Sequence, residues 1–291
     1  DLNRGSSKRL VKLKEAHNQL EDRIKKINRK IRKLRKKSDD NKTDEVIRTG
    51  NGKFYALIIG VSSYIDNRLN LDQPTKDAET LRQLLVNDYS FDEKDVTLLL
   101  DPPRQEILKA MFAFRKKLTQ RDNLLVFYAG HGYWDEEASQ GYWWPVDATP
   151  DDPSFWLSNS DIREQLRGIK SAHSLVISDA CFSGGILRTR NADEIRDAPT
   201  DIILLYKQPS RRAITSGNLS AVPDKSVFFE FLKKKLEDNE EKYLPSQVLF
   251  DNIRKSVINN SLILPQDGVI TDTGDQGGDF IFIRKKSKRE N

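Results

Sequence analysis

The sequence predicts an α/β fold with a mostly parallel central sheet. From residue 53 onward, short apolar runs alternate with longer segments of helical periodicity. This alternation is typical of a parallel sheet with helices on both faces. Two of the apolar runs, 124–129 and 175–177, stop abruptly at small and polar residues. Because parallel strands share one carboxyl edge, we expect the residues that follow these runs to lie at a common site.

The expected elements follow from apolar periodicity and from Gly, Pro and Ser at their ends. In chain order they are strand 54–61, helix 74–89, strand 96–100, a helix from Pro103, strand 124–129, helix 161–166, strand 175–179, strand 213–217, helices 226–236 and 246–257, and strand 280–283. The sheet should therefore have about six strands.

Two segments show no clear period. Residues 133–156 are rich in aromatic and acidic side chains, and we expect irregular structure that lines a substrate groove or belongs to the core. A nucleic-acid stacking platform is disfavoured, because the acidic residues would repel phosphate. Residues 186–209 are only weakly periodic, and a loop of that length inside a compact domain is usually functional or disordered.

The only cysteine of the chain, Cys181, follows the apolar run 175–177 in the stretch LVISDACFSGG. It should therefore lie at the carboxyl end of a core strand, where open α/β sheets bind ligands. Gly184 and Gly185 allow the backbone to turn sharply and to approach a substrate closely. Taken alone, however, a single cysteine is more often a small buried apolar residue.

A second stretch, LLVFYAGHG at 124–132, ends in a histidine between two glycines. Flanking glycines reduce packing, so we interpret His131 as a side chain that is presented rather than buried. An imidazole beside a thiol stabilises the thiolate and later protonates the leaving amine. A histidine about 50 residues before the cysteine is also the spacing of a caspase signature.

These motifs resemble those of the caspase-like cysteine peptidases, closest to the metacaspases and bacterial caspase-like proteins. The resemblance runs in order from about residue 53 to 283. Its matches are YAGHG at 128–132, DACFSG at 179–184, IGV at 59–61, KDA at 76–78, AITSG at 213–217 and GGDFIF at 277–282. It implies a caspase-like three-layer sandwich and a thiol protease of the hydrolase class.

The resemblance also implies catalytic roles for three residues. Cys181 would be the nucleophile, with His131 as its acid/base partner. The backbone amides of Gly132 and Cys181 would hold the oxyanion of the tetrahedral intermediate. The sequence does not indicate a third member of a catalytic triad.

The acidic residues near these motifs predict the substrate preference. Metacaspases have aspartate two residues before the cysteine, as at Asp179, and a second aspartate that matches Asp77 in KDA. Two carboxylates would select Arg or Lys before the cleaved bond, and Ser216 in AITSG is expected to join this substrate-binding pocket. Asp77 has an alternative role as an N-terminal helix charge.

A basic preference makes self-processing of a zymogen a further prediction. Candidate cleavage sites are Arg188, Arg190 and Arg196 after the catalytic strand, and Arg48 before the domain. The simpler alternative is that these arginines are solvated loop residues.

The charge of the chain is unevenly divided, although its net value is only +5. Residues 1–37 carry 15 Lys and Arg against 4 Asp and Glu, whereas the rest carries 34 against 40. We therefore expect a basic helix at 1–37, a polar linker at 38–52 and a peptidase domain at 53–291. The acidic peptidase domain is unsuited to nucleic acid and favours cationic substrates.

The basic arm has the apolar period of a coiled coil. The apolar positions are Leu10, Leu13, His17, Leu20, Ile24, Ile27, Ile31 and Leu34, and the flanking positions hold Arg9, Lys14, Arg23, Lys30 and Arg35 with only Glu21 opposing. Basic flanks would repel each other in a parallel homodimer, so we favour a helical protein partner that is acidic. Self-association, a solvated tail, and binding to nucleic acid or anionic lipid remain alternatives.

Other features set looser limits. No run of about 18 apolar residues occurs, so no membrane span is expected. One cysteine cannot form an internal disulfide, which suits a reducing compartment such as the cytoplasm. The chain begins at Asp1 rather than methionine, as expected of a processed or truncated chain.

No cofactor is required by the sequence, although calcium is a candidate because some metacaspases need it. The acidic candidates show no regular ligand spacing; they are Asp135, Glu136, Glu137, Asp151, Asp152, Asp272, Asp275 and Asp279. The alternative functions are a caspase-fold scaffold, or a sensor of nucleic acid or of a partner that acts through the basic arm.

Overall fold

The structure is a computed structural model that describes residues 20–23, 25–31, 52–180, 187–188, 199–217 and 225–285. The chain divides into two compact units, 1–46 and 47–291. In the first unit, 20–23 and 25–31 are helical, and Leu20, Ile27 and Ile31 are 56%, 55% and 42% exposed. The other apolar positions predicted for the arm lie outside the described residues.

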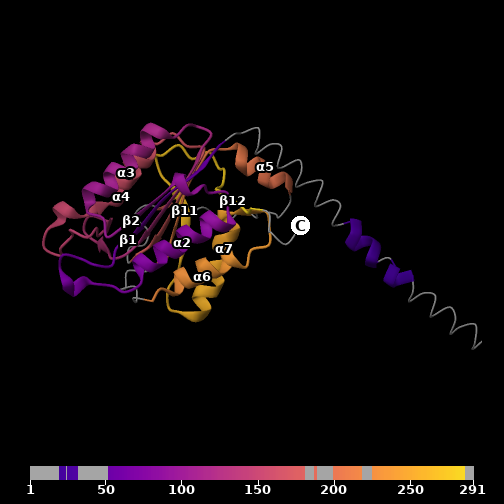
Figure 1. The fold of residues 1–291 in the computed structure, drawn as a ribbon, viewed down its shortest axis with the longest axis horizontal. Helices are drawn as coiled ribbons and strands as arrows, with labels where there is room; N and C mark the ends of the chain where they lie inside the picture. The colour runs from indigo at the N-terminus through magenta and orange to yellow at the C-terminus, as the bar shows by residue number, and fades with distance from the viewer. Residues whose placement is uncertain are drawn as a thin grey trace, which may run out of the picture. The chain divides into compact units, whose positions relative to one another are not determined.

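The second unit is built on a central sheet (Figure 1). Its strand order is β2-β1-β3-β7-β9-β11-β8. Its strands are β1 (Phe54–Gly60), β2 (Val96–Leu100), β3 (Asn123–Ala129), β7 (His173–Asp179), β8 (Leu187–Arg188), β9 (Ser210–Thr215) and β11 (Gln266–Ile270). The first five in spatial order are parallel, and β11 runs antiparallel to both of its neighbours, β9 and β8. Because β8 has only two residues, the prediction of a mostly parallel sheet with about six strands is confirmed.

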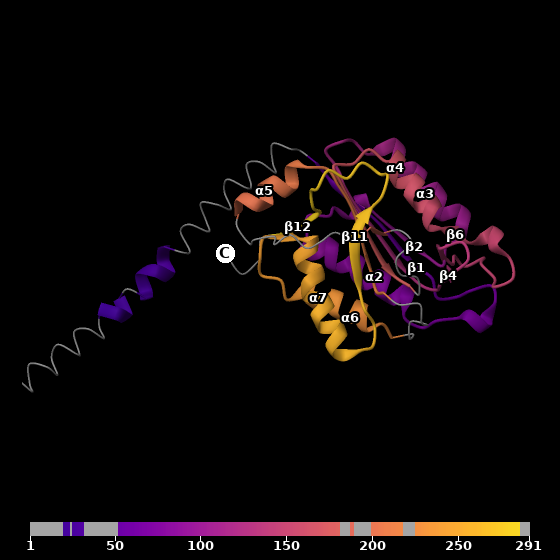
Figure 2. The same cartoon turned by 180° about the vertical axis from the view of Figure 1, so that it is seen from behind.

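Helices cover both faces of this sheet, as Figures 1 and 2 show. The helices are α2 (Pro74–Asp88), α3 (Arg104–Lys117), α4 (Asn159–Gly168), α5 (Pro199–Lys207), α6 (Val227–Glu237) and α7 (Ser246–Asn260). Alternate residues of β1 face opposite layers. Ala56 and Ile58 pack with α2, α6 and α7, whereas Leu57 and Ile59 pack with α3 and α4. The three-layer sandwich is therefore confirmed.

The helices begin where local chemistry favours a start. Pro74 opens α2, where its fixed φ suits the first turn. Ser158 and Asp161 form a reciprocal capping box at α4. The side chain of Ser226 accepts a hydrogen bond from the Phe229 amide at the start of α6.

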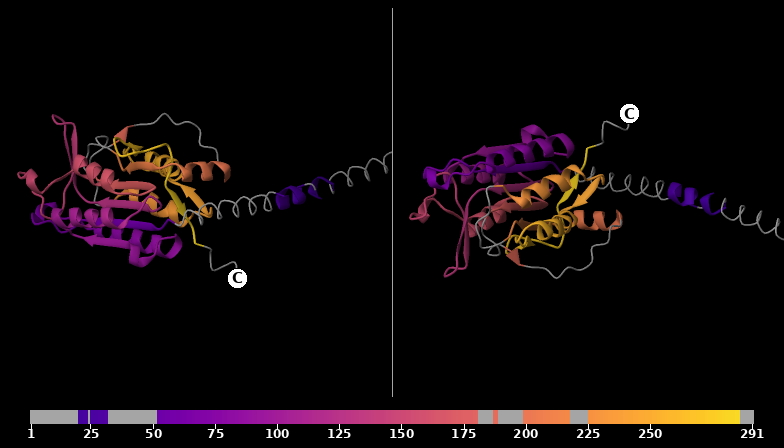
Figure 3. Two further views of the ribbon diagram at one scale, coloured as in Figure 1. Left: turned by 90° about the horizontal axis from the view of Figure 1, so that it is seen from above. Right: turned by 90° about the horizontal axis from the view of Figure 1, so that it is seen from below.

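The expectation of irregular structure at 133–156 is wrong. The segment contains β4 (Gly132–Asp135), β5 (Gln140–Trp143) and a 3₁₀ turn (Pro153–Phe155), and it leads into β6 (Leu157–Ser158). The three strands form a small antiparallel sheet, and Figure 3 shows the pink segment between β3 and α4 projecting from the body of the domain. Aromatic residues occupy both faces of this sheet and hide the polar/apolar alternation that marks a half-buried strand.

Two further expectations need correction. The supposed loop 186–209 contains β8 and α5. The last predicted strand, β12 (Ile281–Ile283), pairs with β10 (Tyr243–Pro245) in a separate sheet, and β11 takes the sixth place. The sequence of β11, QDGVI, combines two polar residues and a glycine, so its strand preference is weak.

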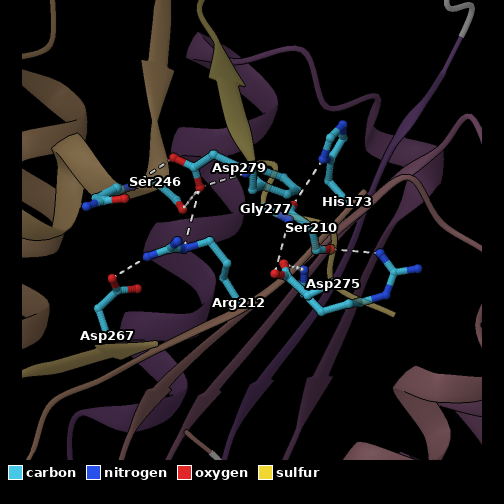
Figure 4. A network of polar contacts seen from close by, with 11 residues as sticks. His173, Ser210, Arg212, Ser246, Asp267, Asp275, Gly277 and Asp279 are labelled. Carbon is cyan, nitrogen blue, oxygen red and sulfur yellow. Dashed lines mark hydrogen bonds and ion pairs between the residues drawn. The ribbon is translucent and has the colours of Figure 1, made fainter. Parts of the chain in front are cut away.

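Strand β9 begins three residues before its predicted start, because Arg211 and Arg212 are buried within it. Arg212 is 3% exposed and lies between Asp267 and Asp279, with its Nε 3.7 Å from Oδ1 of Asp279 (Figure 4). Asp279 also accepts a hydrogen bond from the Ser246 hydroxyl. Since paired charges can be buried, this network permits a strand where a basic loop was expected.

Candidate active site

Three parallel strands end together at one edge of the central sheet. Gly60 of β1 is in register with Ala129 of β3, and Ala129 is in register with Asp179 of β7. Beyond β3, the amide of Gly130 donates to the carbonyl oxygen of Asp179 at 3.4 Å. The histidine loop is therefore tied to the end of the strand that precedes Cys181.

The glycine before the histidine is required by the backbone. Gly130 has φ +153°, and a Cβ there would lie 3.0 Å from the hydroxyl oxygens of both Tyr64 and Tyr128. An L side chain would be strained by both the dihedral angle and the lack of space. The two tyrosine hydroxyls occupy that space because they hold the backbone of His131.

His131 is held from several sides. Its amide donates to the Tyr64 hydroxyl at 2.8 Å, and the Tyr128 hydroxyl donates to its carbonyl oxygen at 2.6 Å. Its ring lies 5.1 Å from the Tyr64 ring and 6.2 Å from the Trp144 ring, centroid to centroid. The residue is half-buried, so the expectation of a presented side chain holds only in part.

The imidazole makes a bond that identifies its tautomer. Nε2 of His131 lies 2.9 Å from the carbonyl oxygen of Leu69. A carbonyl can only accept, so Nε2 carries the proton and Nδ1 keeps its lone pair in the neutral ring. Burial lowers the pKa of His131, and the bond to Leu69 opposes this. The ring is therefore neutral at neutral pH, with Nδ1 as the basic atom.

The Leu69 carbonyl is a part of the site that sequence reasoning missed. It belongs to a 3₁₀ turn, Asn67–Leu69, in the loop after β1. Any residue except proline could present the same backbone carbonyl, so no side-chain pattern signals this role. Only the folded path of the loop, with the Tyr64 amide bonded to the Asn70 side chain at 2.8 Å, brings it to the imidazole.

Asp179 is a buried carboxyl at the end of β7. It is 4% exposed, and burial raises its pKa to about 6, against the opposing effect of the Ser226 and Ser216 hydroxyls. Within the described part of the chain, its Oδ1 has no hydrogen-bond partner. A buried carboxylate oxygen without a donor is costly, so this position suits a ligand that brings a positive charge.

Two serines lie beside this carboxyl, and the sequence predicted one of them. Ser216 is fully buried, and its amide donates to the Ser178 carbonyl oxygen at 2.9 Å. Ser226, which caps α6, was interpreted only as a helix start. Because side chains alternate along β7, Asp179 points to the same layer as Ile177, which packs with α6.

Asp77 lies at the same edge of the sheet but farther along it. It is in the first turn of α2, and that turn is pressed against the end of β1, because a Cβ on Gly60 would lie 2.5 Å from the Pro74 carbonyl oxygen. Gly60 and Asp179 are two strand spacings apart, roughly 10 Å. Fold topology thus brings both predicted pocket acids to one edge.

The remaining two predicted catalytic groups are Gly132 and Cys181. Gly132 begins β4 and pairs with Trp143, directly after His131. Cys181 lies outside the described residues, and the chain is described up to Ala180, which is fully buried.

Comparison with known protein families identifies a match for this domain. The model of the caspase domain matches residues 53–278. This chain belongs to the caspase domain family. The match spans all six longer strands of the central sheet and includes the Cys181 motif.

Similar caspase-family relatives are metacaspases. The chain is 28% identical to Metacaspase-6 of Arabidopsis thaliana over 145 residues, which is 45% of this chain and 38% of that protein. It is 27% identical to Metacaspase-1 of Saccharomyces cerevisiae over 153 residues, 47% of this chain and 34% of that protein. The matches thus span little more than a third of these relatives.

A solved structure has a similar fold. Protein GSU0716 from Geobacter sulfurreducens aligns with a TM-score of 0.54 at 16% identity, over 77% of this chain and 97% of that protein. Across the described ranges, no helix is both long and apolar enough to cross a bilayer.

The acidic residues considered for calcium do not gather in this caspase domain. Among the described residues, no three His, Cys, Asp or Glu side chains come together as metal ligands would. Asp279 is paired with Arg212, and Asp275 accepts from the Arg211 amide at 2.9 Å. Asp135 and Asp152 accept from nearby backbone amides. These carboxylates do not fit a calcium site.

Proposed function

We propose that this caspase-domain chain is a cysteine endopeptidase that cleaves after Arg or Lys, with Cys181 as nucleophile and His131 as its acid/base partner. The observation that carries the proposal is Asp179. It is a buried carboxyl two residues before Cys181, one of its oxygens has no partner among the residues that the structure describes, and its backbone carbonyl accepts a hydrogen bond from the histidine loop. A cationic side chain of a substrate would supply the missing partner of this carboxylate.

The tautomer of His131 supports the chemical steps. Nδ1 accepts the thiol proton of Cys181, while Nε2–H stays on the Leu69 carbonyl and favours the imidazolium. The thiolate attacks the peptide carbonyl carbon and forms a C–S bond, and the amides of Gly132 and Cys181 hold the oxyanion. As the C–N bond breaks, Nδ1–H protonates the leaving amine. Water then hydrolyses the thioester, with His131 as general base.

The proposed pocket selects by charge. The Asp179 carboxylate would pair with a guanidinium or ammonium group, which offsets the cost of its burial. The hydroxyls of Ser216 and Ser226 act on the same carboxyl. Asp77 at the same edge adds a second negative charge, so an aspartate side chain would be repelled.

The first experiment compares fluorogenic peptides that differ only in Arg or Asp before the scissile bond. We expect at least about a 100-fold preference for Arg, because the wrong charge would leave Asp179 unpaired. The pKa of Asp179 is about 6, and only its ionised form attracts a cation. We therefore expect kcat/KM for the Arg peptide to fall about tenfold per pH unit below that value.

Cys181→Ala is the control for contaminating protease, and each peptide is tested with calcium and with EGTA. Cleavage only of the Asp peptide would support the proposed peptidase activity and contradict the proposed acidic pocket. If no peptide is cleaved, the scaffold or sensor function is favoured.

Self-processing is tested by intact-mass analysis of the same samples. Of the candidate cleavage sites, Arg188 is paired in β8 with Val269 of β11. Arg48, Arg190 and Arg196 lie outside the described residues.

The basic arm supports a separate proposal, that residues 1–37 bind an acidic helix of a partner protein. Leu20, Ile27 and Ile31 lie on helical turns and are exposed, although an isolated helix gains stability only by covering its apolar stripe. We expect a designed acidic heptad peptide to bind the full chain and a scrambled peptide not to bind. Binding should weaken with salt and be lost on deletion of residues 1–37. Sedimentation that shows a homodimer without the peptide would contradict this proposal.

A further inference from the structure

The small antiparallel sheet beside His131 has two aromatic faces with different surroundings. Tyr133 and Tyr142 lie directly opposite each other, as do Trp143 and Leu157 in the next pair of strands. Trp143 and Leu157 are fully buried in the core. Because side chains alternate along a strand, Tyr133 and Tyr142 project from the other face.

Four rings cover this other face, which we call the aromatic platform: Tyr133, Tyr142, Trp144 and Trp156. The Trp156 ring lies 5.0 Å from Tyr133 and 5.4 Å from both Tyr142 and Trp144, centroid to centroid. Tyr133 is 40% exposed. The other three rings are half-buried, and Trp144 also packs against the core. The outward face of such a sheet is usually polar, so a cluster of rings that reaches the surface there fits a binding site.

The aromatic platform is continuous with the proposed catalytic histidine. The Trp144 amide donates to the His131 carbonyl oxygen at 3.1 Å, and the two rings are 6.2 Å apart and edge-on. The indole Nε1 of Trp144 is buried and has no hydrogen-bond partner within the ranges that the structure describes. A peptide carbonyl of a bound substrate would satisfy this donor.

The position of the aromatic platform assigns it to one side of the scissile bond, given the proposed peptidase function. Asp179 points to the layer of α6, whereas Tyr64, which packs on His131, belongs to the layer of α3 and α4. His131 protonates the leaving amine, so the residues after the scissile bond leave from its side. The basic residue before that bond occupies the Asp179 side.

The reach of a peptide supports this assignment. Trp144 is 6.2 Å from His131, and Tyr133 is a further 6.2 Å from Trp144. An extended chain rises about 3.3 Å per residue. Trp144 is therefore within about two residues of the scissile bond, and Tyr133 within about four.

We propose that the aromatic platform is the subsite for the substrate segment after the scissile bond, and that it selects a large aromatic or aliphatic side chain there. Apolar burial and stacking on the rings stabilise such a side chain. Burial raises the pKa of Tyr142, and the charges of Asp135 and Asp161 raise it further. That negative surrounding disfavours acidic peptide residues and phosphate.

The test uses two peptides with the same Arg before the scissile bond and either Trp or Ser two residues after it. The wild-type chain reports kcat/KM, and the Cys181→Ala chain reports Kd by fluorescence anisotropy without cleavage. We expect the Trp peptide to be favoured about tenfold in both measurements. Tyr133→Ala should reduce this ratio to below about threefold, whereas Tyr133→Phe keeps the ring and should keep the ratio.

Phe112→Ala is the matched control, because Phe112 is an aromatic residue of α3 that is 47% exposed; it should retain the preference. If Tyr133→Ala fails to fold, the comparison of the Trp and Ser peptides on the wild-type chain still tests the proposed subsite. Equal cleavage and binding of the two peptides would overturn the subsite and leave the peptidase intact. Preferential binding without cleavage would overturn the peptidase and leave the subsite. Binding of a labelled single-stranded oligonucleotide that is lost in Tyr133→Ala would overturn the subsite in favour of a nucleic-acid platform.

Discussion

Replacement of His131 by alanine is expected to lower kcat by about 10³–10⁴, because one atom, Nδ1, both activates the thiol and protonates the leaving amine. Cys181→Ala should lose at least as much. The double variant should be no slower than the worse single variant, since the two groups act as a unit. These rates are measured with the Arg peptide under single-turnover conditions.

The chain contains a matched control for this prediction. His173 starts β7 at the opposite edge of the sheet, and its ring bonds the Ser210 hydroxyl and the Tyr206 carbonyl oxygen, each at 3.0 Å. His173→Asn should lower the free energy of unfolding by about 1–3 kcal/mol and keep catalysis per folded molecule. Wild-type kcat in His131→Ala, or loss of kcat in a folded His173→Asn chain, would show that the catalytic histidine has been misassigned.

The second large effect is expected at Asp179, whose ionised carboxylate would bind the substrate but lowers the stability of the fold. Burial raises the pKa of Asp179 from 3.8 to about 6, so the folded state binds an additional proton between these values. The stability of the wild type should therefore fall as pH rises from about 4 to 6, by about 3 kcal/mol at about 1.4 kcal/mol per pH unit. Asp179→Asn cannot ionise and should escape this loss.

We therefore expect Asp179→Asn to be more stable than the wild type above pH 6 by about 1–3 kcal/mol. The difference should vanish below pH 4, where the carboxyl is protonated in both folded and unfolded states. The same variant should lose about 10²–10³-fold in kcat/KM for the Arg peptide, because the cation would have no charged partner. Urea unfolding across this pH range and the paired peptides measure the two effects.

Asp267 is the matched control for Asp179. It is mostly buried too, but it is paired with Arg212, which is 3% exposed. Asp267→Asn should therefore destabilise the fold above pH 6, since part of the charge of a buried arginine would be left without its partner. It should not change the preference for Arg over Asp peptides. A more stable Asp267→Asn, or an unchanged preference in Asp179→Asn, would contradict this account of the two carboxyls.

Sequence periodicity predicted the elements whose apolar residues face a single core. Strands β1, β2, β3 and β7 and helices α2, α6 and α7 were placed within a few residues, because their patterns reflect burial directly. The pattern was less informative where burial is mixed. In β4 and β5, aromatic residues cover both faces, and in β11 polar residues and a glycine interrupt the run.

The errors at β9 have a different cause. Arg211 and Arg212 are 7% and 3% exposed, although arginine is rarely buried. Their partners come from distant segments: Arg212 meets Asp267 and Asp279, and Arg211 donates to the Ser171 carbonyl oxygen at 2.7 Å. No local pattern in the sequence contains those pairings.

The amino-acid sequence was sufficient to predict the family, the strands that precede His131 and Asp179, and the residue types that would carry the proposed chemistry. These follow from covalent order, since a residue after a parallel strand must emerge at the carboxyl edge. The folded structure was needed to show that the Leu69 carbonyl bonds the imidazole, that Ser226 joins Ser216 beside Asp179, and that four aromatic rings continue from His131. These contacts join segments far apart along the chain, and two of them use a backbone carbonyl or a helix cap, which carry no distinctive side-chain signal.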